Sequence, residues 1–99
     1  MTYQIVLREY FVKKYTKIIK RNKPLQEKIN KVILEISNDP TSPKLKTHKI
    51  LLGKNDFSYS SRVTGDIRII WDYDKNGCVE IIELLDIGGH SGGNKVYRN

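Results

Sequence analysis

The feature that most constrains the fold is a pair of amphipathic helical segments with a short interruption between them. Apolar residues recur at spacings of three and four over residues 8–21 and again over residues 25–36, the period of one helix face. Asn22-Lys23-Pro24 separates the two segments, because proline lacks an amide donor and fits best in a first helical turn. The second ends at Ser37-Asn38-Asp39-Pro40. Two helices so closely connected form an antiparallel hairpin, and its apolar stripes must be buried against another layer.

Four candidate strands supply that layer. One precedes the helices at residues 3–7, where Tyr3, Ile5 and Leu7 alternate with their neighbours. Three follow the helices, at residues 57–63, 67–73 and 78–86, and the segments that join them, residues 64–66 and 74–77, contain the glycines typical of hairpin loops. The sequence therefore predicts one domain over residues 1–99. Its fold is a two-layer α+β arrangement of order β-α-α-β-β-β, with the helical hairpin packed on a mainly antiparallel sheet.

Composition excludes several classes of protein. The chain has 99 residues, of which 38% are hydrophobic and 29% are charged, and these values are typical of a globular domain with a modest core. No apolar run is long enough to span a membrane, and the N-terminus lacks the basic and apolar regions of a signal peptide. We therefore expect a cytoplasmic protein that does not contact membranes. Cys78 is the single cysteine, so no internal disulfide can form.

The charge of the chain indicates its class of partner. A net charge of +7 and a pI near 9.6 attract polyanions. Nucleic acid is the expected partner, because each neutralised phosphate releases counterions and so adds affinity. The alternative is that the lysines only keep the surface solvated.

Two arginines flank the loop at residues 64–66. If this is a three-residue loop, Arg62 lies directly opposite Arg68 on one face of the hairpin, with Cβ atoms about 5 Å apart. Like charges so close destabilise a hairpin unless an anion lies between them, and guanidinium groups match the oxygens of a phosphate. In the alternative interpretation each arginine pairs with Asp66, Asp72 or Glu83, or simply faces solvent. A two-residue loop would put the arginines on opposite faces.

Two histidines are candidates for proton transfer, because a pKa near 6.5 suits general acid–base catalysis. His90 follows the last strand between two Gly-Gly pairs, and Asp86 is near enough in sequence to orient it. His48 lies in the basic segment 44–49, which is equally compatible with a solvated loop. Neither histidine has the spacing of a zinc site, and no phosphate-binding P-loop is present, so no metal or cofactor is expected.

At this point the sequence resembles a known family. The segment RVTGDIRIIW, followed by LLDIGGH and the later Val-Tyr pair, is similar to the RelE/ParE superfamily of toxins from type II toxin–antitoxin systems. The resemblance extends from the first strand to Tyr97 and is strongest with the YafQ and RelE branches, which cleave messenger RNA on the ribosome. It implies a RelE-like fold with a curved sheet.

The resemblance also assigns roles to residues. His48 and His90 match histidines of the YafQ-like toxins, and Asp66 matches an acidic residue of the turn. Arg62 replaces a histidine or a basic residue, and Arg68 occupies a strand position that is common in the superfamily. Tyr97 matches a C-terminal aromatic residue, but it follows His90 by seven positions where the family usually has about four.

The mechanism that these matches imply is metal-independent. The 2′-hydroxyl of the RNA attacks the adjacent phosphate, with His90 as the acid and His48 or Asp66 as the base. Arg62 and Arg68 stabilise the charge that builds up on the phosphate. The lysines expected to follow RNA phosphates are Lys44, Lys46, Lys49 and Lys54.

The resemblance further implies two kinds of partner. One is a cognate antitoxin, usually acidic and partly disordered until bound. The other is the ribosome with its messenger RNA; no contact with DNA alone is expected. Two alternatives stay open: a ParE-like toxin that inhibits DNA gyrase, and a member that binds RNA without cleaving it. The histidine ending, which ParE-like toxins generally lack, favours the nuclease.

Overall fold

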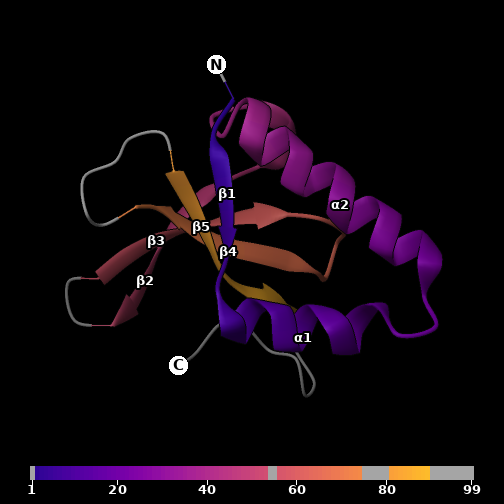
Figure 1. Ribbon diagram of the computed structural model, residues 1–99. Coiled ribbons are helices and arrows are strands. Elements are labelled where there is room, and N and C mark those ends of the chain that lie inside the picture. The colour runs from indigo at the N-terminus through magenta and orange to yellow at the C-terminus, as the bar shows by residue number, and fades with distance from the viewer. Residues whose placement is uncertain (1, 54–55, 75–80, 90–99) are drawn as a thin grey trace.

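The computed structural model describes residues 2–53, 56–74 and 81–89 of the chain. Two helices and five strands form two layers, so the α+β class predicted from the sequence is confirmed (Figure 1). In chain order the elements are β1 (Gln4–Leu7), α1 (Glu9–Ile19), α2 (Lys23–Asn38), the short 3-10 helix η1 (Pro43–Leu45), β2 (His48–Gly53), β3 (Asp56–Arg62), β4 (Arg68–Tyr73) and β5 (Ile81–Gly88). Strand β2 is an addition to the predicted order.

Both helices begin and end close to where the sequence predicts. Helix α2 begins after Asn22, whose side-chain oxygen accepts a hydrogen bond of 3.3 Å from the Leu25 amide, with Pro24 in the first turn. Arg21, in the connection, has a left-handed backbone with φ of 60°. This conformation turns the chain sharply enough for α2 to fold back beside α1. None of the described helices is long and apolar enough to cross a membrane.

The sheet has the strand order β1-β5-β4-β3-β2. Strand β1 pairs with β5 in parallel, and the other three pairings are antiparallel, as the expected mainly antiparallel sheet requires. The pairing of β1 with β5 brings the start of the chain beside a strand near its end. Strand β2 pairs only with β3, at the opposite edge of the sheet.

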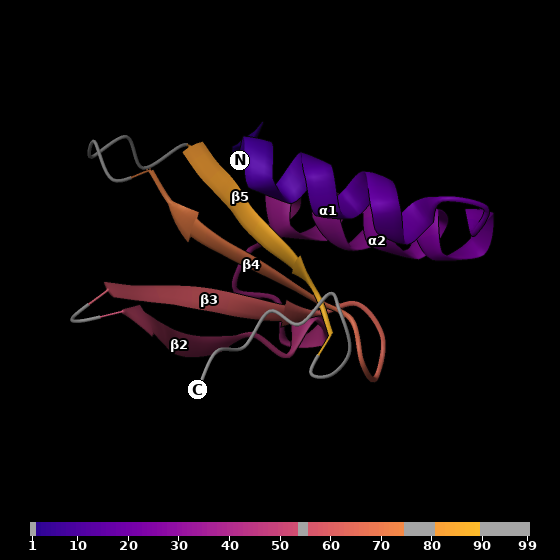
Figure 2. The same cartoon turned by 90° about the horizontal axis from the view of Figure 1, so that it is seen from below.

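Both helices cover the same face of the sheet (Figure 2). Phe11 of α1 and Ile29 and Ile36 of α2 pack in one buried cluster with sheet residues that include Trp71 and Leu84. The Trp71 indole donates a hydrogen bond of 2.7 Å to the Ser61 hydroxyl, which is also 2.7 Å from the Thr47 hydroxyl. The buried indole N–H is therefore hydrogen-bonded, as buried polar groups in a stable core are.

Side chains alternate between the two faces of a strand, so the residues between the core positions point away from the helices. We call this second surface the site face. From the register of the strands, its residues on β2, β3 and β4 include His48, Ile50, Ser58, Ser60, Arg62, Arg68 and Ile70.

Candidate functional site

The loop between β3 and β4 determines how the two arginines lie. Val63 donates a backbone hydrogen bond of 2.9 Å to Ile67, and the Thr64 hydroxyl accepts bonds from the amides of Asp66 (3.2 Å) and Ile67 (2.9 Å). The loop thus has three residues, and Arg62 pairs directly with Arg68 in the register of the strands. The predicted register is confirmed, and the two guanidinium groups share the site face.

The environment of Arg62 favours an anion. Its side chain is exposed, and its Nε donates a bond of 3.3 Å to the Thr64 carbonyl. Among the described residues no carboxylate forms an ion pair with Arg62. Arg68 starts from the opposite position about 5 Å away, so a phosphate bound beside Arg62 lies within reach of both guanidinium groups.

His48 joins this surface because of β2. It is the first residue of the strand and lies opposite Ser60, which in turn lies opposite Ile70. Arg62 is the diagonal neighbour of His48, a separation of about 7–8 Å between strands. The imidazole is exposed. An accessible imidazole and two guanidinium groups therefore share one face of the sheet.

Asp66 packs against the end of β5. A Cβ atom built on Gly89 would lie 2.5 Å from Oδ2 of Asp66 and 2.8 Å from its Cγ, so the carboxylate occupies the space that any side chain would need. Arg68 lies opposite Gly88, the residue before this contact. The loop carboxylate is thus brought to the residue that precedes His90 in the sequence. Sequence reasoning missed Gly89 as a site residue, although the Gly88-Gly89 pair was a signal.

Asp86, considered as a group that orients His90, has other partners. Its carboxylate accepts a bond of 2.8 Å from Lys14 and one of 2.7 Å from the Ile87 amide. Asp86 lies in β5 and is half-buried, and its ion pair with Lys14 joins this strand to α1.

The predicted RNA-binding lysines do not all converge. Lys44 lies in η1, and Lys46 follows it with a left-handed backbone, φ of 47°; both are exposed. Lys49 is paired with Tyr59, on the other face from His48, and its Nζ lies 5.0 Å from the centre of the Phe57 ring. The structure therefore does not bring Lys49 to the site face. Lys54, His90 and Tyr97 lie outside the described residues.

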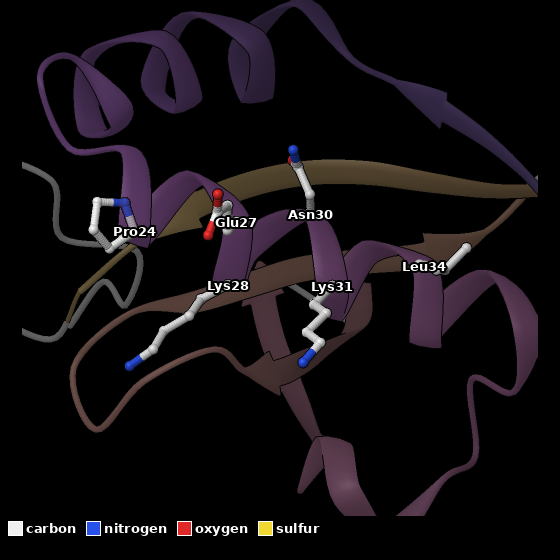
Figure 3. A pocket seen from close by; sticks show the side chains of 6 residues that line it. All are labelled: Pro24, Glu27, Lys28, Asn30, Lys31 and Leu34. Atoms are coloured by element: carbon white, nitrogen blue, oxygen red, sulfur yellow. The ribbon is translucent and has the colours of Figure 1, made fainter.

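A pocket of about 570 Å³ lies on α2, lined by Pro24, Glu27, Lys28, Asn30, Lys31 and Leu34 (Figure 3). It contains no histidine, and its two lysines project outward, so we attach no chemistry to it. Within the described ranges no group of three or more His, Cys, Asp or Glu side chains is close enough to hold a metal ion.

No protein-family model matches the sequence, and no curated protein matches it. Solved structures do match. The chain has the fold of the RelE-like toxins.

Three solved structures illustrate this likeness. The chain matches the RelE–RelB complex of Pyrococcus horikoshii at 22% identity and a TM-score of 0.68, over 92% of this chain and 98% of that chain. The YoeB/ParE toxin from Agrobacterium tumefaciens is 20% identical, with a TM-score of 0.69 over 89% of this chain and 99% of its own. The DinJ–YafQ toxin–antitoxin complex of E. coli matches at 17% identity and a TM-score of 0.69, over 91% and 94%. At these identities the RelE-like fold is what the chains share.

Proposed function

We propose that the protein is the toxin of a type II toxin–antitoxin system and cleaves messenger RNA on the ribosome, in the cytoplasm, without a metal ion. The observation that carries the proposal is the pairing of Arg62 with Arg68 on the face that also holds His48. Two guanidinium groups can bind the oxygens of a phosphodiester, and an imidazole beside them can transfer a proton during its cleavage. The RelE-like fold supports the same conclusion.

The chemistry assigns one role to each group. A base, His48 or Asp66, accepts the proton of the RNA 2′-hydroxyl as its oxygen attacks the adjacent phosphorus. The bond from phosphorus to the 5′-oxygen breaks, and His90 donates the proton that this oxygen takes up. Positioned acids and bases contribute typically about 10²–10⁴-fold each. The products are a 2′,3′-cyclic phosphate and a 5′-hydroxyl.

Arg62 and Arg68 act on charge and do not transfer protons. Arginine keeps its proton at all relevant pH values, so Arg62 cannot supply the proton transfer of a histidine in its position. Both guanidinium groups bind the phosphate oxygens and stabilise the negative charge that develops on them, a type of contribution worth about 10²–10³-fold for one donor. Tyr97 completes the proposed site, and Lys44, Lys46 and Lys54 guide the RNA.

The proposed partner is an acidic antitoxin. The structures of RelE with RelB, YoeB with YefM and YafQ with DinJ are described as complexes, and the last as a toxin–antitoxin complex. An antitoxin that inhibits this chain is expected to cover Arg62 and so to abolish cleavage. An inhibited complex that left the site face accessible to RNA would contradict this.

The test adds the purified protein to translating ribosomes and maps the ends of the message by primer extension. We expect cuts that require ribosomes and disappear with His48→Ala, Arg62→Gln or His90→Ala. Gln4→Ala, on the far edge strand, is the matched control and should cut normally. A message with a single 2′-deoxynucleotide at the cut position should stay intact at that position, because the attacking hydroxyl is absent.

Each other outcome has a definite meaning. Cuts that persist in all three variants would reject the assigned residues. An intact message would reject the nuclease and leave the two alternatives, a gyrase inhibitor or a protein that only binds RNA. A DNA supercoiling assay separates these two.

A further inference from the structure

The positive charge of the chain is concentrated in one part of the molecule. Residues 8–31 contain nine Lys or Arg and two Glu, a surplus of seven positive charges. Residues 32–99, which include strands β2 to β5, contain nine basic and nine acidic residues. The net charge of +7 therefore belongs to the helical hairpin and not to the sheet that carries the candidate site.

These charges lie on the outside of the helical layer. Lys13, Lys17 and Lys20 follow one another at spacings of four and three residues and so line one side of α1, away from buried Phe11. Lys28 and Lys31 project to the same side of α2 (Figure 3). With Arg21 in the connection and Lys23 in the first turn of α2, the set comprises seven exposed cations, which we call the hairpin surface: Lys13, Lys17, Lys20, Arg21, Lys23, Lys28 and Lys31.

Folding does not account for this arrangement. In the part of the chain that the structure describes, no member of the hairpin surface forms an ion pair. Glu27 is the single acidic residue between positions 10 and 31. Lys23, in the first turn of α2, also lies at the positive end of the helix dipole, where a cation destabilises the helix. Lysines that served only solubility would be distributed over both layers.

The residues between the cations indicate which polyanion fits. Residues 16–31 contain no aromatic residue, so nothing there can stack on unpaired bases, as proteins that bind single strands do. Of the exposed large hydrophobic side chains, Tyr10 and Val12 precede the hairpin surface in the chain, and Leu34 follows it and lines the same pocket as Lys28 and Lys31. Between Lys13 and Lys31 no described large hydrophobic side chain is exposed, so the centre of the surface offers a partner charge and not apolar anchors. The partner must therefore be recognised through its charged backbone.

We infer that the hairpin surface binds the phosphate backbone of double-stranded RNA, at a site separate from the site face. Successive cations on α1 are about 4.5–6 Å apart along the helix axis, close enough to meet neighbouring phosphates of a duplex. Duplex RNA is recognised mainly by its shape and through its phosphates and 2′-hydroxyls, which needs no base-reading side chains. The choice of RNA over DNA rests on the proposed function.

The consequence is a protein that contacts RNA on both sides of its sheet. A folded RNA on the helical layer holds the protein in place, and the site face stays open to a different, single-stranded segment. Binding to the first RNA does not require cleavage of the second, so the two activities can be measured apart.

The test compares two triple variants that each lower the net charge by three. One replaces Lys17, Lys20 and Lys28 with Gln; the other replaces Thr2, Gln4 and Asn38, which are exposed and lie outside both the site face and the hairpin surface, with Glu. Both also carry His48→Ala so that no RNA is cut, and thermal unfolding checks that both are folded. Binding to a labelled RNA duplex of about 16 base pairs, the length that a double-stranded RNA-binding domain spans, is followed by fluorescence anisotropy at increasing salt.

We expect the hairpin triple to bind the duplex at least tenfold more weakly than the parent His48→Ala protein. Its plot of log affinity against log salt should also be less steep by about two to three, because each lost phosphate contact removes about 0.9. The triple with three added glutamates should bind within about twofold of the parent, because it leaves the hairpin surface intact.

An equal loss in both triples would show that only net charge matters and would overturn the inference, as would normal binding by the hairpin triple. Equally tight binding of a DNA duplex would overturn the assignment to RNA. The proposed function fails separately: an intact message on ribosomes, with duplex binding that depends on the hairpin, would reject the nuclease alone.

Discussion

Two buried serines on β3 differ in what their hydroxyl groups contact. Ser61, on the core side, accepts the Trp71 indole hydrogen bond and lies within hydrogen-bonding distance of Thr47, whereas Ser58 Oγ, on the site face, is buried and has no hydrogen-bond partner among the described residues. We expect Ser61→Ala to lower the free energy of unfolding by about 1–3 kcal/mol, because it leaves a buried N–H unpaired.

Ser58→Ala is the matched control, since it removes a hydroxyl that gains nothing from burial. Its free energy of unfolding, from urea denaturation, should equal or exceed that of the unmodified protein. Equal losses in the two variants would contradict the difference in pairing.

Gly89 is the residue with the least room for a side chain. A Cβ there would lie 2.5 Å from Asp66 Oδ2, whereas one on Gly65 would meet nothing closer than Arg62 Nη2 at 3.7 Å, an ordinary contact. We expect Gly89→Ala to displace the Asp66 carboxylate and to lower both the midpoint of thermal unfolding and the rate of message cleavage. Gly65→Ala should change neither, and equal effects of the two substitutions would refute the contact.

The sequence predicted local relations between site residues and missed distant ones. The pairing of Arg62 with Arg68 followed from the length of one loop, because loop length determines the register of a hairpin. The contact between Asp66 and Gly89 joins residues that are far apart in the chain, and no local pattern encodes it. The position of His48 was unknown for a related reason, since it depends on a strand that was not predicted.

At the scale of elements, β2 shows why that strand was missed. An edge strand pairs on one side only, and its side chains need not enter the core: Leu51, directly opposite Phe57, is 58% exposed. The lysines that flank His48 gave the segment the appearance of a loop. Backbone hydrogen bonds to β3 hold it in place, and these are independent of side-chain type. The helices, by contrast, have apolar stripes that determine them locally.

Helix α2 offers a prediction that separates stability from binding. Its first turn contains no acidic residue and carries Lys23. Lys23→Glu should raise the free energy of unfolding by about 0.3–1 kcal/mol, because an anion there complements the helix dipole. The same variant should bind the RNA duplex more weakly. Asn22→Ala is the control for the opposite sign: it removes the helix cap and should cost about 0.5–2 kcal/mol without a change of charge.

A lower free energy of unfolding for Lys23→Glu, measured in urea, would show that this turn is stabilised by something other than the dipole. Unchanged duplex binding would remove Lys23 from the hairpin surface.

For the whole molecule, an aromatic cluster links stability to alkaline pH. Tyr73 is packed between Tyr3 and Tyr59, with ring centres 6.1 and 5.7 Å away. Burial first, and then the neighbouring tyrosines and Asp72, raise the pKa of Tyr73 above its ordinary value of 10.0. In the unfolded chain Tyr73 releases its proton at lower pH than in the folded protein. Its contribution is therefore complete below about pH 10 and is lost as the pH rises further.

Tyr73→Phe should make the decline in the free energy of unfolding between about pH 9 and about pH 11 less steep. Tyr10→Phe, at an exposed position on α1, controls for the loss of one hydroxyl group. Urea denaturation at each pH gives the slopes, and identical slopes for Tyr73→Phe and the unmodified protein would reject the coupling.

The parallel pairing of β1 with β5 has a consequence for biosynthesis. Gln4 lies opposite Ile81, and β5 stands between β1 and the rest of the sheet. During synthesis β1 has no strand to pair with, and Phe11 lacks the β5 side chains that enclose it in the folded protein. The native structure can therefore form only after residues 81–88 have left the ribosome. A chain interrupted before that point cannot assemble the sheet, so an incomplete copy of this protein also lacks the closed core around Phe11.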